Sequence, residues 1–189
     1  MTEILTQLER SMLLKLARQS MEHAVRGQAL PPLHLAALTP PMQALGASFV
    51  TLTMAGELRG CVGALEPSQP LAEDVREHAI AAAREDYRFP QVRESELQDI
   101  HIEISRLTVP VPLEYTTPED LLNKLQPGLD GVIVKDGWKR ATFLPQVWEK
   151  VSGKEEFLEH LCYKMGVARD LWRRKHLDVL IYRVEEFHE

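Results

Sequence analysis

The run of residues from Leu58 to Gly63 could carry chemistry, because it places one of only two cysteines between two glycines and close after an arginine. Glycine lets a backbone approach a ligand closely and lets N–H groups converge on an anion. The cation of Arg59 favours the thiolate of Cys61, which is the reactive form of cysteine. The same run, with Gly60, is equally well explained as a tight strand turn around a buried cysteine. The sequence leaves both interpretations open.

A nucleophilic cysteine needs a base, most often histidine, within hydrogen-bond reach. None of the seven histidines stands at a diagnostic spacing from Cys61. His101 is the better candidate, because alternation with isoleucines places it on the polar face of a strand. Glu103 and Ser105 share that face, where they line a cleft or simply face water. His78 lies on or beside the apolar stripe of its helix, and a solvated or locally satisfied histidine is the alternative in both cases.

The segment Asp86-Tyr87-Arg88-Phe89-Pro90 supplies a second candidate group. The guanidinium of Arg88 is a fixed fork of donors suited to a carboxylate or phosphate. An Asp86–Arg88 pair that organises a turn is the alternative, and the spacing favours it. If the protein is an enzyme, Cys61 is the nucleophile, Arg59 and Arg88 hold an anionic group, and Asp86, Glu103 or His101 orient these groups or move protons.

The remaining motifs point mainly to structure. Cys162, Trp148 and Trp172 fall among apolar helical residues and are expected in the core. Pro145-Gln146 suggests a buried turn whose Gln146 amide anchors the turn or points into a cleft. The sequence contains no metal-binding pattern, phosphate loop or serine-hydrolase elbow, and it names no cofactor.

Composition narrows the class of protein. The 189 residues fit one domain, with 44% hydrophobic and 26% charged residues. A net charge of −6 argues against nucleic-acid binding. The start, Met1-Thr2-Glu3-Ile4, is unlike a signal peptide, and no apolar run is long enough to span a membrane. Two cysteines without CxxC spacing favour free thiols in the cytoplasm.

The pattern of elements predicts an α+β fold with a mainly antiparallel sheet. Helices are expected where apolar residues recur at helical spacing, over residues 2–26 (capped by Thr2, with Leu5, Leu8, Met12 and Leu16 inward), 70–86, 117–125, 155–165 and 168–174. Strands are expected over residues 47–54, 57–63, 100–105, 131–134, 138–143 and 177–184. Ala55-Gly56-Glu57 and Asp136-Gly137 are expected to turn two hairpins.

Several of these segments resemble the AMME chromosomal region candidate gene 1 protein family, whose bacterial members are called AmmeMemoRadiSam system protein A. The similar segments occur in family order from about residue 47 to 186; they are the run from Leu58 to Gly63, Asp86 to Pro90, Ile102 to Ser105, Gly131 to Val134, Phe143 to Val147 and Leu161 to Gly166. Tyr87, Gln91 and Met165 depart from the family pattern, and Tyr87 leaves the turn after the second helix open.

The resemblance implies one family domain over residues 1–189, with a larger lobe that contains both termini and a smaller lobe. It also implies association with a Memo-like protein and with a radical SAM enzyme, but it supplies no reaction. Two hypotheses follow. The protein is a cysteine-dependent enzyme acting on an anionic small molecule or a modified protein, or it is a non-catalytic binding or adaptor module for one of those partners.

Overall fold

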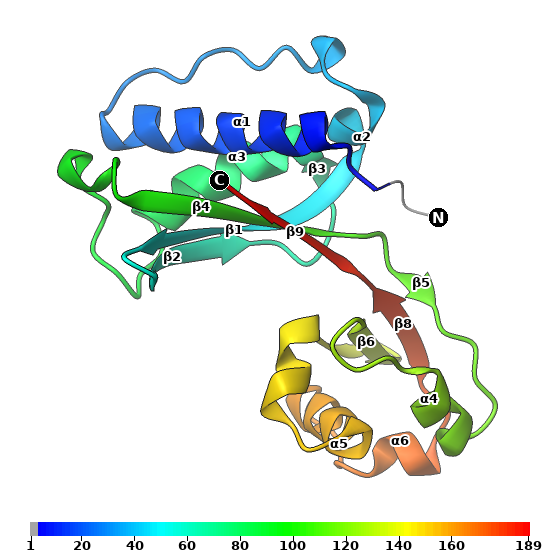
Figure 1. Ribbon diagram of the computed structural model, residues 1–189. Helices are drawn as coiled ribbons and strands as arrows, with labels where there is room; N and C mark the ends of the chain where they lie inside the picture. Colours follow the sequence, from blue (N-terminus) through cyan, green and yellow to red (C-terminus); the bar gives the residue numbers. More distant parts are fainter. Residues whose placement is uncertain (1–3) are drawn as a thin grey trace. The chain divides into compact units, whose positions relative to one another are not determined.

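The computed structural model describes residues 4–189, which fold as two compact units (Figure 1). Unit 1 comprises residues 4–108 and 185–189 of this described chain, and unit 2 comprises residues 109–184. Each unit has its own antiparallel sheet and its own apolar core. The α+β class predicted from the sequence is confirmed.

The sheet of unit 1 has five strands in the order β2-β1-β4-β9, with the short β3 paired to one end of β1. β1 lies between β2 and β4 and is antiparallel to both. The strands are β1 (Leu45–Met54), β2 (Glu57–Gly63), β3 (Gln69–Pro70), β4 (Ile100–Leu107) and β9 (Val184–His188). The helical elements of this unit are α1 (Gln7–Val25), η1 (Leu35–Ala37), α2 (Pro40–Gln43), α3 (Leu71–Arg84) and η2 (Glu94–Glu96).

The long helices α1 and α3 lie on the same side of this sheet (Figure 1). The expected stripe of α3 is confirmed, because Leu71, Val75, Ala79 and Ala82 are all buried. Gly60 of β2 lies directly under α3, and a Cβ there would overlap the carbonyl oxygen of Ala82. The glycine therefore allows the helix backbone to approach the strand.

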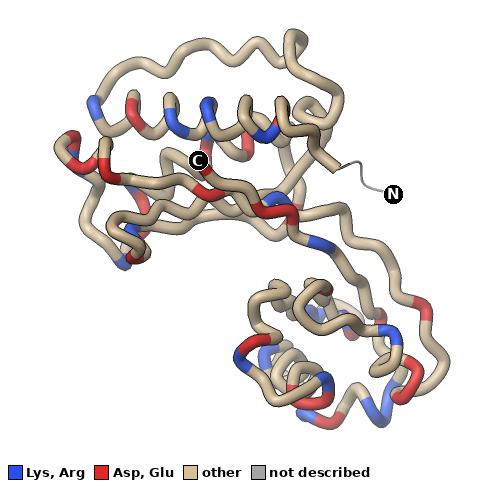
Figure 2. The backbone as a smooth tube through the Cα atoms, in the orientation of Figure 1, with Lys and Arg blue, Asp and Glu red and all other residues tan. Residues whose placement is uncertain are grey.

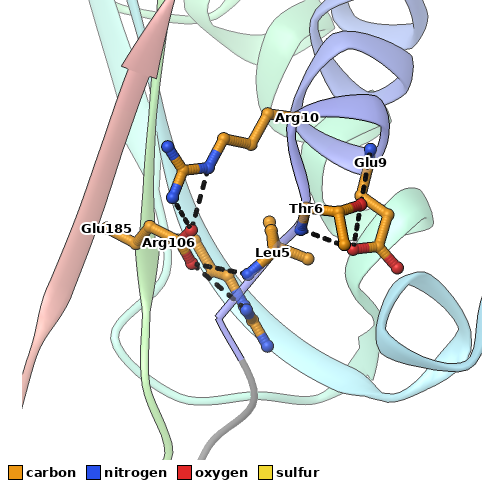
Figure 3. Close-up of polar contacts among 6 residues, drawn as sticks. All are labelled: Leu5, Thr6, Glu9, Arg10, Arg106 and Glu185. Atoms are coloured by element: carbon orange, nitrogen blue, oxygen red, sulfur yellow. Dashed lines mark hydrogen bonds and ion pairs between the residues drawn. The ribbon is translucent and has the colours of Figure 1, made fainter.

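Helix α1 begins at Gln7, not near Thr2, which lies outside the described residues. Thr6 caps it: its hydroxyl accepts a bond from the N–H of Glu9 (3.3 Å), and the Glu9 carboxylate accepts one from the N–H of Thr6 (2.7 Å; Figure 3). This capping box satisfies two backbone donors at once.

The predicted inward stripe of α1 is wrong for Leu8, which is 67% exposed. The buried residues of the helix are Glu9, Leu13, Ala17, Ser20 and Met21. The sequence of α1 has apolar residues on more than one side of the helix. The packing of α3 against α1 therefore decides which of these residues are buried.

One closing strand was expected over residues 177–184, but the structure has two, β8 and β9, which belong to different sheets. Glu185 anchors β9 in unit 1. Its carboxylate accepts bonds from Arg10 of α1 (2.6 Å) and from Arg106 of β4 (3.3 Å; Figure 3). The run of alternating residues continues through both strands, so periodicity alone could not show the break.

Unit 2 has a four-stranded sheet in the order β5-β8-β6-β7. Its strands are β5 (Val111–Pro112), β6 (Gly131–Asp136), β7 (Lys139–Phe143) and β8 (Asp178–Tyr182), and its helices are α4 (Pro118–Lys124), η3 (Pro145–Lys150), α5 (Lys154–Lys164) and α6 (Leu171–Arg174). The predicted helix start at Thr117 is confirmed, since its side chain accepts the N–H of Asp120.

The core of unit 2 contains Trp148, Phe157, Cys162 and Trp172, so the expected burial of both tryptophans and of this cysteine is confirmed. Trp148 stacks on Phe157 with ring centroids 3.6 Å apart. None of the helices in residues 4–189 is both long and apolar enough to cross a membrane.

Candidate functional site

Cys61 lies on β2, at the edge of the unit 1 sheet, in a row of three side chains that crosses the sheet. Cys61 pairs with Thr51 of β1, and Thr51 pairs with Glu103 of β4. The neighbouring pairs along the strands contain Leu52 and Ile102, which are fully buried in the core shared with the helices. Because side chains alternate across a strand, the row of Cys61, Thr51 and Glu103 lies on the face opposite the helices.

The thiol is half-buried and reduced. The hydroxyl of Thr51 donates a hydrogen bond to Cys61 Sγ over 3.3 Å. Thr51 is therefore the polar group that acts directly on this sulfur.

Asp86 and Arg88 clamp the peptide groups of Cys61. Asp86 Oδ2 accepts the N–H of Cys61 (2.8 Å), and Arg88 Nη2 donates to the carbonyl oxygen of Cys61 (3.1 Å). The two clamping side chains bind each other through Arg88 Nε to Asp86 Oδ1 (2.9 Å) and Arg88 Nη2 to Asp86 Oδ2 (2.7 Å). They satisfy the outward N–H and C=O that an edge strand would otherwise leave unpaired.

This pair is charged throughout the neutral range. Hydrogen bonds from the Arg88 side chain, aided by the N–H groups of Cys61 and Arg88, hold the pKa of the Asp86 carboxyl well below its usual range against the opposing effect of burial. The same carboxylate raises the pKa of Arg88. Asp86 is buried, whereas 46% of the Arg88 side chain is exposed. Arg88 Nη1 has no hydrogen bond within residues 4–189, so this part of the fork remains open to an anion beside Cys61.

Arg59 points elsewhere. The register of β1 and β2 shifts between Leu52, opposite Gly60, and Thr53, opposite Leu58, so Arg59 is the extra residue of a bulge. Its guanidinium binds Glu96 (2.9 and 3.1 Å) and the carbonyl oxygens of Pro90 and Gln91.

Arg59 therefore ties the loop over residues 85–99 to β2. Its hydrogen bonds also lower the pKa of Glu96. The side chain of Arg59 is thus used for structural contacts. Arg88, in contrast, lies beside Cys61 and binds its carbonyl oxygen.

The two histidines do not flank the thiol. His101 is exposed and lies two pairs further along β4, opposite Thr53. His78 contacts the buried Asp74 on α3 (3.2 Å), which in turn accepts a bond from Ser48 (2.6 Å). That cluster lies on the helix-covered side of the sheet.

The other predicted site residues are placed as follows. Ser105 is buried opposite Phe49, whose ring lies against Gly63. Pro145 and Gln146 belong to unit 2, where Pro145 is buried and Gln146 is exposed, so the turn is buried only in part.

Sequence reasoning missed Thr51 and Glu96. Thr51 is one of several hydroxyl residues in β1, and only strand register reveals that it faces the thiol. Glu96 is one of several acidic residues in its loop. Only the bulge, which directs Arg59 toward this loop, shows that Glu96 is the partner of Arg59. Within residues 4–189, no group of three His, Cys, Asp or Glu side chains is placed to hold a metal ion.

Together these features define an α+β protein with a clamped cysteine on the edge strand of its larger sheet. The family model described as AMMECR1 matches residues 14–187, so this chain belongs to the AMMECR1 family.

Its relatives include a protein of Methanothermobacter thermautotrophicus, 41% identical over 184 residues, covering 94% of this chain and 92% of the relative. Protein MK0488 of Methanopyrus kandleri is 37% identical, covering 100% and 92%. The crystal structure of the uncharacterized protein PH0010 from Pyrococcus horikoshii is similar with a TM-score of 0.78 and 32% identity, covering 98% of this chain and 93% of that one.

Proposed function

We propose that this protein is a thiol-dependent enzyme in which Cys61 Sγ acts as nucleophile or covalent carrier on a substrate with an anionic group. The observation that carries the proposal is the hydrogen bond from Thr51 to a half-buried thiol whose own peptide is held at both ends. A positioned nucleophile needs this kind of fixed geometry.

Arg88 is the group proposed to hold the anion. Arg88 binds the carbonyl oxygen of Cys61 through Nη2, and its side chain is partly exposed. Its Nη1 is therefore available to an anion beside the thiol. Arg59, by contrast, has no role in substrate binding in this proposal, because its donors are used by Glu96 and the loop. Glu103, across Thr51 from Cys61, is the carboxylate proposed to take the thiol proton through water.

The test is alkylation of the full chain by iodoacetamide at pH 7, followed site by site. Cys162 is fully buried, and burial raises the pKa of its thiol, so it is an internal reference that should stay unmodified. Cys61 is expected to react faster than free cysteine at the same pH. Thr51→Val should slow the reaction severalfold, while Thr53→Val, two residues along the same strand, should leave it unchanged.

Two results would overturn the enzyme proposal. One is a Cys61 that is not modified while the protein is folded. The other is a rate at or below that of free cysteine with no effect of Thr51→Val. Either result would show a thiol that is not activated.

A binding or adaptor function is the second candidate, favoured by one observation. Arg59 and Asp86 both use their side chains to hold the fold together, as residues of a structural motif would. In that case Cys61→Ser leaves partner binding intact, whereas charge reversals on the surface do not. The partners proposed for either function are a Memo-like protein and a radical SAM enzyme in the cytoplasm, and the family resemblance is what supports them.

A further inference from the structure

Aromatic and cationic side chains, most of them exposed, gather near the end of helix α5 in unit 2, apart from the Cys61 site. We call it the α5-end patch, and it consists of Trp138, Lys139, Tyr163, Lys164 and Arg169. Trp138 is 89% exposed and Tyr163 is 66% exposed. The position of α5 within unit 2 is shown in Figure 1.

Trp138 is unexpected where it stands. β6 and β7 pair up to Asp136 and Lys139, so Gly137 and Trp138 form the two-residue turn of the hairpin, and Trp138 is not a strand residue as the sequence suggested. The turn requires Gly137, which has φ +60°. It places no demand on the next side chain, so the turn itself does not account for the exposed indole of Trp138.

The patch is held together by the two lysines. Lys139 Nζ donates to the carbonyl oxygen of Gly166 (3.1 Å) and lies 5.8 Å from the ring centre of Trp138. Lys164 Nζ donates to the carbonyl oxygen of Thr142 (2.9 Å). These bonds fix the hairpin tip against the end of α5, so the patch is ordered before any partner arrives.

Among the described residues, no carboxylate forms an ion pair with the cations of the patch. Among residues 4–189, no Asp or Glu oxygen lies within 4 Å of the cationic nitrogens of Lys139, Lys164 or Arg169. Arg169 lies over the ring of Tyr163 (4.9 Å), and its charge helps to lower the pKa of Glu156. Five other cations of unit 2 form ion pairs: Lys124 with Asp120, Arg173 with Glu155, Arg174 with Asp170, Lys175 with Asp136 and Arg183 with Asp130.

We infer that the α5-end patch binds an acidic segment of a partner protein, with carboxylates on Lys139, Lys164 and Arg169 and an apolar side chain on Trp138. Exposed Trp, Tyr and Arg are the residues that dominate binding energy at protein interfaces. Each lysine head uses one N–H on a carbonyl and keeps two for carboxylates. The inference does not depend on Cys61.

A nucleic acid fits this surface less well. Unit 2 as a whole is close to neutral, with 12 Lys and Arg and 11 Asp and Glu, and unit 1 is acidic. Both signs of charge are spread along unit 2 (Figure 2). Nucleic-acid affinity depends on neutralising many phosphates in a row, and three cations do not provide such a track.

The first experiment locates the binding by acrylamide quenching of tryptophan fluorescence in the full chain. Trp148 and Trp172 are buried (7% and 1% exposed), so Trp138 is the main indole that acrylamide reaches. An eight-residue peptide of six Glu and two Leu is expected to reduce the quenching in a saturable way at low salt. A peptide of six Lys and two Leu should not.

The second experiment measures affinity from the fluorescence anisotropy of the labelled acidic peptide. Arg169→Glu is expected to weaken binding at least fivefold. Lys150→Glu makes the same charge change on an exposed lysine outside the patch and should change the affinity less than twofold. Neither residue has a hydrogen bond or an ion pair in the structure that the change would break.

Three outcomes would overturn the inference. They are no saturable protection of Trp138 by the acidic peptide, equal losses with Arg169→Glu and Lys150→Glu, and tighter binding of a twelve-nucleotide oligothymidine than of the peptide. The last would identify a single-strand stacking surface instead.

Discussion

Asp86 shows how one residue can organise a site that the sequence only hints at. It stands 25 residues after Cys61, yet its carboxylate accepts the N–H of Cys61 and two bonds from the Arg88 side chain. The residue types alone suggested either a ligand-binding arginine or a pair that organises a turn, and the structure combines the two roles. The pair forms the turn, and the turn brings Arg88 to the carbonyl of Cys61.

The depressed pKa of Asp86 leads to the first prediction, for Asp86→Asn. A carboxyl with a lowered pKa in the folded state stabilises the fold fully above its unfolded pKa of about 3.9, and this contribution is lost as the pH falls toward the folded value. At pH 7 the variant should lose about 1–3 kcal/mol of unfolding free energy, since the buried bonds from Arg88 are weakened.

The measurement is urea unfolding of both proteins between pH 7 and pH 3. The difference between wild type and variant should narrow below about pH 4. Glu96 and Glu9, whose pKa values are also lowered, are present in both proteins and so cancel in the comparison. A difference that stays constant over this range would contradict the assignment of the charge to Asp86.

At the scale of elements, the bulge in β2 has the largest consequence. It turns Arg59 away from the sulfur and toward the loop over residues 85–99, while Gly60 admits the backbone of α3. One extra residue in the strand thus gives Arg59 and Cys61 different roles. Arg59 holds the loop, and Cys61 keeps its side chain on the face away from the helices.

The second prediction concerns Arg59→Gln. It removes a nearly buried ion pair and the bonds to Pro90 and Gln91, so we expect a loss of about 2–3 kcal/mol of unfolding free energy. Hydrogen exchange should rise first in the amides of residues 90–99. Arg93→Gln is the matched control: this arginine also faces Glu96, at 3.8 Å, but is 81% exposed, and its loss should cost under about 0.5 kcal/mol.

If exchange rises equally in α1 and in the loop, Arg59 stabilises unit 1 generally and does not act through the loop. The alkylation rate of Cys61 in Arg59→Gln tests separately whether Arg59 affects the reactivity of the thiol. A rate like that of wild type would show that Arg59 does not act on the sulfur.

For the whole molecule, the two units differ in their cores and in their charge. The core of unit 1 is built from α1, α3 and the five-stranded sheet, and the core of unit 2 from α4, α5, α6 and the four-stranded sheet. Residues 4–108 and 185–189 are acidic, whereas unit 2 is close to neutral. The candidate thiol site lies in unit 1 and the α5-end patch in unit 2.

The third prediction tests the separate cores with Leu121→Ala. Leu121 of α4 is 1% exposed in the core of unit 2, and its truncation should cost about 2–5 kcal/mol. Hydrogen exchange should rise most in unit 2. Leu52→Ala, at 0% exposure in unit 1, is the reciprocal variant and should raise exchange most in unit 1. Uniform acceleration of all amides by either change would show one cooperative core instead.

The sequence by itself determined the class of fold and the positions of most elements. Period-2 and period-3.6 patterns, the Thr117-Pro118 helix start and the stop at Gly166 depend on neighbours in the chain, so they can be read locally. The same is true of the candidates at Cys61, Asp86 and Arg88, because their residue types already restrict their chemistry.

Only the tertiary structure decided which of these groups act together. Strand register places Thr51 beside the sulfur, a bulge removes Arg59 from it, and the split between β8 and β9 assigns Glu185 to unit 1. These outcomes depend on residues 10 to 175 positions apart in the chain. No local pattern encodes such pairings, because the free energy that selects them comes from packing whole elements against one another.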